Sequence, residues 1–405
     1  MLISDDLLLA LPKTDLHLHL DGSLRLSTIL ELAERQGVDL PGSTEKELTE
    51  RVFKDQYTSL FDYLQGFQYT CAVLQTAQAL ERASRELAED CIAEGVCYIE
   101  VRFAPMLHMT HLTFDEVLLA VNRGLSQAQK EYNMAVDASG EDKPYFYYGI
   151  ITCALRMFDD KTVGWYGPYF ERFHSTEGRE VYAMASLELA RQTVRARDLY
   201  KIPIVGLDLA GNEQGFPAKH HKAAFQYAHK HFLKKTVHAG EAYGAESIFD
   251  ALTVLYADRI GHGFYLFSEE RCTSKKIANP QEYIQSISNH LADRRITIEV
   301  CLSSNIQTIP KLPSISKHPL GKMLEERLST TICTDNRLIS NTSICKELRL
   351  AVDNFDINPT QLRHQIIYGF KRSFFFGSYL QKRLYVRQVL DYCVSTMRKH
   401  GVFQA

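Results

Sequence analysis

The sequence predicts a (β/α)8 barrel of the TIM type with extra helices near its C-terminal face, forming one domain over residues 1–405. Short apolar segments rich in β-branched and aromatic residues alternate with segments of helical periodicity, which indicates parallel βα units. Eight such apolar segments occur, the number a closed barrel requires. Almost every one ends in a polar or metal-binding residue, and barrel enzymes carry their chemistry at these strand ends.

The predicted strands follow one another along the chain. They are TDLHLHL (14–20), VCYIEVRF (96–103), YFYYGIITCAL (145–155), IPIVGLDL (202–209), KTVHA (235–239), DRIGHG (258–263), RITIEVCL (295–302) and STTICTD (329–335). Their apolar character suits a sheet that is covered by helices on one face and filled by its own side chains on the other.

Helical segments lie between these strands. The apolar period over 26–33 is expected to end at Gly37, and that over 80–91 at Gly95, because glycine favours the left-handed turn after a helix. The pair Asn358-Pro359 predicts a helix start. Two stretches exceed a minimal barrel, 40–95 and 156–200. Each follows a strand end, so we expect both to overhang the mouth of the barrel.

The composition is that of a globular protein, with 45% hydrophobic and 23% charged residues. A net charge of −3 favours neither a nucleic acid nor an acidic membrane as a partner. The segment MLISDDLLLALPKTD lacks the basic region of a signal peptide, and no run approaches the roughly 18 apolar residues of a membrane span. Nine scattered cysteines without a C-x-x-C predict free thiols in a reducing cytoplasm.

The first predicted strand places two histidines on one face. His17 and His19 alternate along it, so both imidazoles are expected to point into the barrel, where they could bind a divalent metal. The alternative is a pair of solvent-facing histidines. Asp21 follows at the turn and offers a carboxylate nearby.

Three later strand ends add residues of the same kind. His238 could be a third ligand, and Glu241 comes back over the same space after a glycine turn, as a proton carrier would. His262 stands between two glycines, and Asp335 could be an oxygen ligand. Each has an ordinary alternative: a first-turn glutamate, a core histidine, a capping aspartate. Together with the first strand they indicate a mononuclear hydrolytic metal site.

Seven motifs resemble the adenosine deaminase family, in family order and over nearly the whole chain. They are PKTDLHLHLDGSL (12–24), EGVCYIEVRFAP (94–105), GLDLAGNE (206–213), TVHAGE (236–241), RIGHG (259–263), EVCLSSN (299–305) and ICTDN (332–336). The resemblance implies one zinc ion per chain, with the ligands His17, His19, His238 and Asp335. Three imidazoles and a carboxylate do not by themselves exclude iron or cobalt.

The resemblance also implies how a 6-aminopurine nucleoside would be converted to an inosine-like product and ammonia. A zinc-activated water attacks C6, His262 orients and deprotonates that water, and Glu241 protonates N1. The backbone N–H of Gly211 contacts N3, and Asp21 binds the ribose 5′-hydroxyl.

Other residues follow from the resemblance with alternatives left open. Asp208 is expected either to hydrogen-bond near the metal or to serve the fold. Tyr63 and Phe67 occupy positions that cover the sugar, or one face of an amphipathic helix. Asn336 stands where better-known members carry an aspartate that contacts N7, and an amide can donate there at any pH. The Asp-Asn-Arg form resembles a bacterial branch of the family.

Adenosine or deoxyadenosine in purine salvage is therefore the expected substrate. One alternative is 6-amino-6-deoxyfutalosine, a 5′-extended analogue used in menaquinone synthesis. The aromatic segment 164–170 with Trp165 would then be either a wall of a larger pocket or a surface flap packed on its own helix. Adenine, methylthioadenosine and AMP are substrates of other relatives, and a catalytically silent nucleoside-binding protein is the alternative from another class. The sequence lacks the P-C-x-x-C of cytidine deaminases and the G-x-G-x-x-G of dinucleotide sites, and it does not indicate the oligomeric state.

Overall fold

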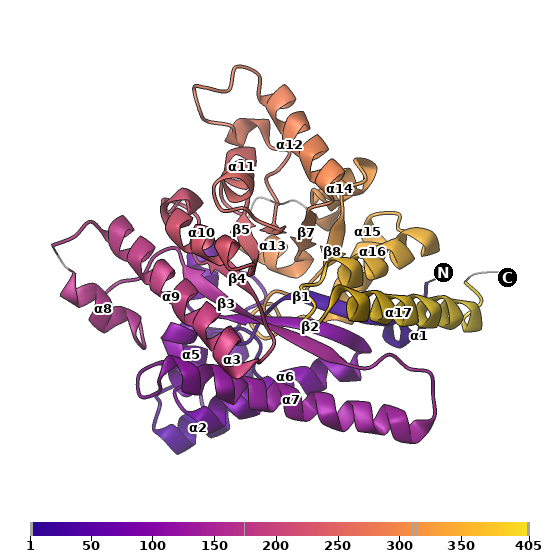
Figure 1. The fold of residues 1–405 in the computed structure, drawn as a ribbon, viewed down its shortest axis with the longest axis horizontal. Helices are drawn as coiled ribbons and strands as arrows, with labels where there is room; N and C mark the ends of the chain where they lie inside the picture. The colour runs from indigo at the N-terminus through magenta and orange to yellow at the C-terminus, as the bar shows by residue number, and fades with distance from the viewer. Residues whose placement is uncertain (1–2, 174, 310–311, 313, 403–405) are drawn as a thin grey trace.

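A computed structural model describes residues 3–173, 175–309, 312 and 314–402. Its centre is an eight-stranded parallel sheet whose strands are ordered β1 to β8 as in the chain, with the helices arranged around it (Figure 1). An isolated parallel bridge between Leu18 and Asp335 joins the end of the last strand to the first. The backbone N–H of His19 donates to the carbonyl of Asp335 at 2.8 Å across the same seam. The sheet thereby closes, and the predicted (β/α)8 barrel is confirmed.

The strands match the eight predicted segments. They are β1 (Lys13–His19), β2 (Val96–Phe103), β3 (Tyr147–Leu155), β4 (Ile204–Ala210), β5 (Lys234–Ala239), β6 (Arg259–His262), β7 (Thr297–Val300) and β8 (Thr330–Ile332). The last strand is shorter than predicted because the chain turns at Asp335, whose φ is 62°.

The helices are α1 (Asp5–Ala10), α2 (Leu26–Gln36), α3 (Glu45–Arg51), α4 (Leu60–Leu64), α5 (Phe67–Val73), α6 (Ala77–Ala93), α7 (Phe114–Ser139), α8 (Tyr166–Arg172), α9 (Gly178–Tyr200), α10 (Lys222–Lys230), α11 (Ala245–Thr253), α12 (Pro280–Arg294), α13 (Leu302–Thr308), α14 (Leu320–Glu325), α15 (Ile344–Asn354), α16 (Pro359–Arg372) and α17 (Tyr379–Lys399). Short 3-10 turns include η1 (Pro105–His108), η2 (Ala218–His221), η3 (Glu269–Arg271) and η4 (Ile315–Lys317).

Local sequence signals set several helix ends as predicted. Gly37 adopts φ 66° after α2, and its N–H donates to the carbonyl of Ala33. Gly95 has φ 77° just after α6. Asn358 caps α16 in a capping box with Gln361.

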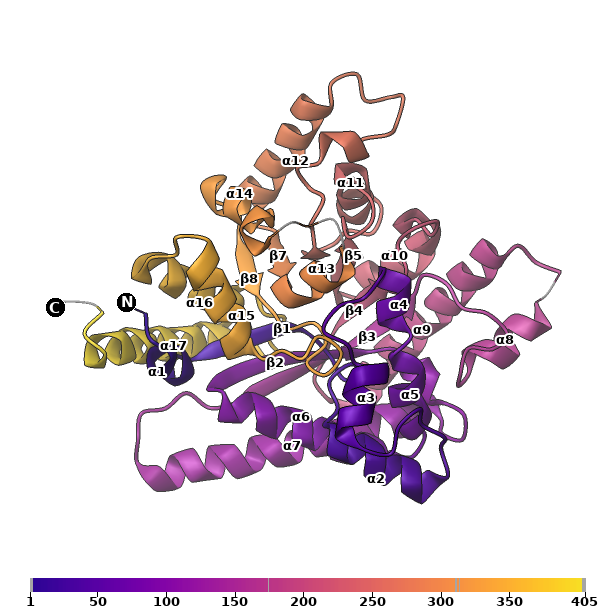
Figure 2. The same ribbon diagram turned by 180° about the vertical axis from the view of Figure 1, so that it is seen from behind.

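The extra helices lie where the insertions were expected. Figure 2 shows α3, α4 and α5 on the viewer's side of the sheet, and most residues of 60–72 line the cavity at the barrel mouth. The second insertion divides into two parts. Residues 157–159 and 161–163 line the same cavity, whereas α8 projects from the side of the barrel in both views.

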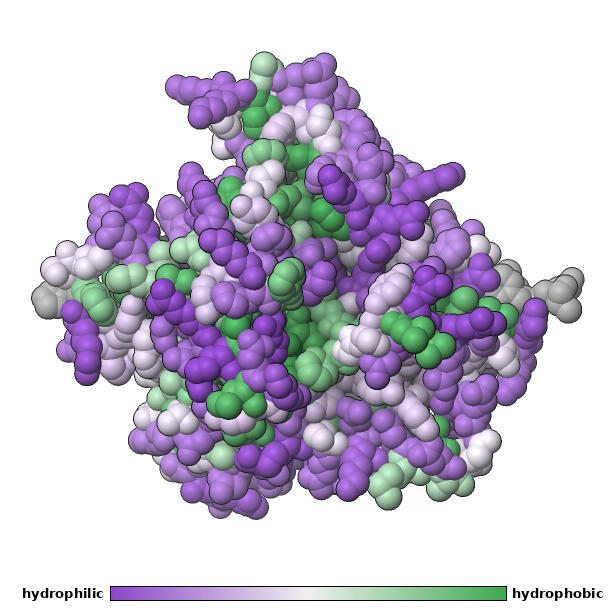
Figure 3. Space-filling model, in the orientation of Figure 1, coloured by the Kyte–Doolittle hydropathy of each residue, from purple (hydrophilic) through white to green (hydrophobic). Residues whose placement is uncertain are grey.

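The core fills the barrel and the layer between strands and helices. Every residue of β1, β2 and β4 is buried. The face drawn in Figure 3 is mainly hydrophilic, with apolar side chains gathered in patches between helices. The nine cysteines are free thiols, seven of them buried. Among the described residues, no helix is both long and apolar enough to cross a bilayer. A single unit over 1–405 and a cytoplasmic location stay predictions.

Candidate metal centre and active site

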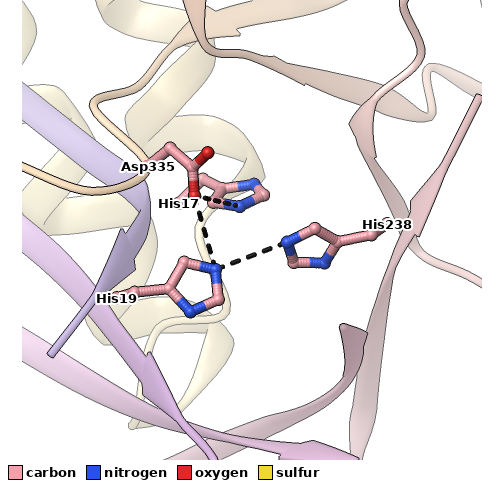
Figure 4. A group of neighbouring side chains, drawn as sticks. All are labelled: His17, His19, His238 and Asp335. Atoms are coloured by element: carbon pink, nitrogen blue, oxygen red, sulfur yellow. Dashed lines mark hydrogen bonds and ion pairs between the residues drawn. The ribbon is translucent and has the colours of Figure 1, made fainter. Parts of the chain in front are cut away.

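Four predicted ligands converge at the C-terminal end of the barrel (Figure 4). His17 and His19 come from β1, His238 from β5, and Asp335 follows β8. One atom of each lies within 4.8 Å of the others, and all four residues are buried. Nε2 of His17 and Nε2 of His19 lie 3.4 and 3.5 Å from Oδ1 of Asp335, and Nε2 of His19 lies 3.3 Å from Nε2 of His238.

The protonation of these groups fits a cation at their centre. Nδ1 of His17 donates to the carboxylate of Glu299 at 2.9 Å, so in the neutral ring Nε2 carries a lone pair. That Nε2 is buried and has no hydrogen-bond partner among the described residues. Nδ1 of His238 likewise donates to Asp208 at 3.0 Å. Buried imidazole nitrogens that face one another beside a carboxylate are the donor set of a structural or catalytic zinc site.

Carboxylates behind the cluster hold the imidazoles in place. Arg102 donates to Asp208 at 3.1 Å and to Glu299 at 2.9 Å, and thereby joins the partners of His238 and His17. Burial raises the pKa of Glu299, but the guanidinium groups of Arg102 and Arg259 outweigh it and hold that pKa well below its usual range. Both carboxylates therefore stay ionised acceptors, which fixes the ring orientation of the ligands.

Asp335 occupies a strained position at the end of β8. Its φ of 62° is rare for a non-glycine residue, and Ser304 donates to its Oδ2 at 2.6 Å. Burial acts to raise the pKa of Asp335, but the neighbouring imidazoles outweigh it and hold that pKa well below its usual range. The carboxylate is thus ionised, as an oxygen ligand must be.

Glu241 lies beside the cluster on a loop held by another carboxylate. Glu213 accepts from the backbone N–H groups of residues 240, 241, 242 and 243, and from the hydroxyl of Ser247. Burial, followed by the charges of Asp335 and Glu213, raises the pKa of Glu241 to about 8. A cation at the neighbouring cluster would act in the opposite direction. The loop therefore presents a carboxyl group that can hold a proton near neutral pH.

His262 lies at one end of a series of hydrogen bonds that runs through Asn305 to His318. The backbone N–H of Leu320 donates to Nδ1 of His318 at 3.1 Å, so the neutral ring carries its proton on Nε2. That Nε2 contacts Oδ1 of Asn305 at 3.1 Å, and Nδ2 of Asn305 contacts Nδ1 of His262 at 3.1 Å. Burial holds the pKa of His262 well below its ordinary value, so the ring is neutral. The chain thus places the proton of His262 on Nε2, 3.8 Å from Oε1 of Glu241.

A cavity of about 670 Å³ opens over the cluster. The predicted substrate residues Asp21, Gly211, Asn336, Tyr63 and Phe67 all line it. Gly211 adopts φ 93°, a left-handed conformation that favours glycine. Because glycine has no side chain, its backbone forms this part of the cavity wall. Nδ2 of Asn336 donates to the hydroxyl of Tyr63 at 2.9 Å, which leaves the second amide hydrogen for a ligand.

Trp165 is the correction among the predicted pocket residues. It does not line this cavity but stacks on Tyr169, with ring centroids 4.0 Å apart. The aromatic residues of 164–170 pack chiefly among themselves and their neighbours, and Phe158 lines the cavity instead.

Several residues of the site had no role in the sequence analysis. Glu299, Arg102 and Glu213 are buried charges that act through their partners. The signal that could have found Glu299 and Arg102 is a charged residue inside an apolar strand, which requires an ion-pair partner when it is buried. Asn305 and His318 carried no such signal, because their hydrogen bonds to His262 and to each other join residues 43 and 13 positions apart in the chain.

Comparisons with known proteins agree with this geometry. The model of a family described as adenosine deaminase matches residues 12–145 and 177–386. An adenosine deaminase from Mycobacterium avium is 35% identical over 366 residues, covering 90% of each chain. A probable adenosine deaminase from Dictyostelium discoideum is 36% identical over 92% of this chain, which spans only 42% of that longer protein.

Solved structures share the fold. An amidohydrolase from Burkholderia ambifaria with bound zinc superposes with a TM-score of 0.74 at 17% identity, over 98% of this chain and 94% of that one. An N6-methyl-AMP deaminase from Arabidopsis thaliana gives a TM-score of 0.71 at 22% identity, over 96% and 98%. With the ligand cluster, the acid and the family model in agreement over most of the chain, this protein belongs to the adenosine deaminase family and is a hydrolytic aminohydrolase.

Proposed function

We propose that this enzyme deaminates an unphosphorylated 6-aminopurine nucleoside, adenosine or deoxyadenosine, with one zinc ion held by His17, His19, His238 and Asp335. The observation that carries the proposal is the carboxyl group of Glu241 beside a three-histidine, one-aspartate cluster at one cavity, where burial raises the pKa of Glu241 to about 8. When bound, zinc supplies a Lewis acid and ionises water near neutral pH.

The protein's own residues supply proton transfer and orientation. Glu241 donates its proton to N1 of the purine, which removes the aromatic stabilisation at C6 and prepares that carbon for attack. His262 donates from Nε2 and thereby orients the attacking water. With its proton on Nε2, His262 can orient the water, which is one part of the role expected for it. To accept a proton at Nε2 it would need its own proton on Nδ1, and the hydrogen bonds through Asn305 and His318 would then have to reverse their direction.

Other groups hold the purine and the sugar. The free amide hydrogen of Asn336 donates to N7, and the backbone of Gly211 contacts N3. The carboxylate of Asp21, which lines the cavity, accepts from the ribose 5′-hydroxyl.

The charges of the cavity favour a nucleoside over its 5′-phosphate. Away from the metal cluster, the charged residues among the described lining are Asp21, Asp159 and Lys161. A phosphate near Asp21 would meet a buried carboxylate, and the lining offers it no arginine fork. The Arabidopsis relative acts on a nucleotide by name, so this charge pattern is a point of difference to test.

A second candidate substrate is a nucleoside extended at its 5′ position, such as 6-amino-6-deoxyfutalosine. A cavity of about 670 Å³ and the contribution of residues 157–163 to its wall favour it. Its extension is not a phosphate, so the charge argument does not exclude it.

The experiment compares kcat/KM of the zinc-loaded enzyme for adenosine, AMP and 6-amino-6-deoxyfutalosine, followed by the ultraviolet change from adenine to hypoxanthine. We expect adenosine to exceed AMP by about 100-fold or more, the scale of discrimination by buried polar groups. A chelator should abolish turnover and zinc should restore it. A preference for AMP would overturn the nucleoside assignment, and failure of all three substrates would support a silent binding protein.

A further inference from the structure

A second polar cluster, Asp21, Cys71 and His108, lies at the wall of the same cavity. Asp21, Cys71 and His108 each place one ligating atom within 4.8 Å of the others, and all three are buried. His108 ends η1, the turn that follows β2, and its side chain is fully enclosed. Neither of its ring nitrogens has a hydrogen-bond partner among the described residues. A buried imidazole with two unpaired nitrogens is costly, so this residue calls for a role.

The position of His108 relative to Asp21 indicates that role. Asp21 lines the cavity, whereas His108 is not part of the lining and so lies behind the carboxylate. Nε2 of His108 is 3.8 Å from Oδ2 of Asp21, in ion-pair range but beyond the usual hydrogen-bond limit of about 3.2 Å. Oδ1 of Asp21 is also buried and has no hydrogen-bond partner among the described residues.

We infer that His108 is a positioning residue for the sugar: when a nucleoside binds, Nε2 of His108 donates to Oδ2 of Asp21 and so holds the carboxylate toward the ribose 5′-hydroxyl. The inference rests on the proposed nucleoside substrate. A carboxylate held on one oxygen by a buried imidazole loses the rotational freedom that would otherwise weaken its hydrogen bond to the ligand. His108 touches no substrate, and it acts only through Asp21.

The test separates this role from a general effect on folding by deleting the substrate group instead of a residue. Adenosine and 5′-deoxyadenosine differ only in the hydroxyl that Asp21 accepts. In the His108→Leu variant we expect kcat/KM for adenosine to fall about 10-fold, the scale of one hydrogen bond to a charged group, and kcat/KM for 5′-deoxyadenosine to change by less than about twofold. The His108→Gln variant keeps a donor and should recover part of the selectivity for adenosine.

Two controls accompany these variants. His221 is also buried but lies outside the cavity lining, where it contacts Ser186, so His221→Leu should alter both substrates by the same factor. In an Asp21→Ala background, His108→Leu should produce no further loss of selectivity, because the double mutant removes the interaction from both sides.

The outcomes are distinguishable. If the unmodified enzyme deaminates neither nucleoside, the proposed function fails and the inference fails with it. If it deaminates adenosine but His108→Leu and His108→Gln lose both substrates equally, only the role of His108 is overturned. Elemental analysis of the zinc-loaded enzyme should give one metal per chain. A second equivalent that disappears in Cys71→Ser would instead identify Asp21, Cys71 and His108 as a metal site.

Discussion

The loop that carries Glu241, the proposed catalytic acid, depends on Glu213. Its Oε2 accepts from the N–H groups of Glu241, Ala242 and Tyr243 at 3.0, 2.5 and 3.0 Å, and Oε1 accepts from Gly240 at 3.1 Å. A Glu213→Gln replacement keeps the shape but turns one acceptor oxygen into an NH2 group that faces N–H donors. Each charge-assisted bond contributes about 1.5–3 kcal/mol. We expect the loss of two of these hydrogen bonds to displace Glu241 and to reduce transition-state stabilisation by about 3 kcal/mol. This reduction corresponds to a fall of about 100-fold in kcat.

The pH profile carries a second signature of the same change. The charge of Glu213 is one of the causes that raise the pKa of Glu241 to about 8, after burial and Asp335. Activity that needs protonated Glu241 is lost as pH rises through that pKa, so Glu213→Gln should move this alkaline limb to lower pH. Steady-state kinetics from pH 5.5 to 9 measures both effects, with zinc content as a check on the metal site.

Glu347 offers a matched control. It is also a fully buried carboxylate, and it accepts from the N–H groups of Leu302 and Ser303 and from the hydroxyl of Thr342. Glu347→Gln should lower stability without moving the alkaline limb. If Glu213→Gln keeps its kcat within about twofold and its limb in place, or if Glu347→Gln shifts the limb equally, the positioning argument is refuted.

Three further predictions concern the site. The Glu241→Gln variant should lose turnover by about 1,000-fold or more while zinc stays bound. In the metal-free unmodified protein, the raised pKa of Glu241 makes the folded state bind a proton that the unfolded state releases, so its free energy of unfolding should fall as pH rises from about 4.5 to 8. The metal-free variant should lose this pH dependence in thermal unfolding. Glu299→Gln should weaken zinc about 10- to 100-fold in chelator competition, because His17 loses its ionised acceptor, and unchanged affinity would contradict that role. Asn336→Asp should make kcat/KM fall with rising pH, since only a protonated carboxyl donates to N7; a pH profile parallel to that of the unmodified enzyme would show that N7 is not read by this side chain.

The fold could be predicted from the sequence because its signals are local and repeated. Each of the eight apolar segments contains the observed strand or most of it, and helix ends at Gly37 and Asn358 follow from capping rules that involve neighbours in the chain. Strand ends were less well placed. The prediction for the last strand ran to Asp335 because composition does not show where a chain leaves the sheet, whereas the left-handed φ of that residue does.

The metal ligands could also be predicted from local sequence signals, whereas the buried charges that hold them in place could not. The spacing of His17 and His19 along a strand is sufficient to place both side chains on the same face. Arg102 and Glu299 are separated by 197 residues, and only closure of the barrel brings them within 2.9 Å. Trp165 left two alternatives open, a wall of the pocket or a flap packed on its own helix, and its stacking on Tyr169 agrees with the second.

The backbone at the strand ends shows what the site costs the fold. His262 and Asp335 adopt φ of 64° and 62°, and such positions cost about 1–3 kcal/mol each in a non-glycine residue. A glycine at either place would relax the backbone but remove the imidazole or the carboxylate that the chemistry needs. Gly261 leaves room for the ring of His17, because a Cβ at this position would lie only 3.1 Å from that ring. The closed barrel fixes both positions through the pairing of β6 with β5 and the bridge from Leu18 to Asp335, so rigidity distributed over the sheet maintains strain at these two residues.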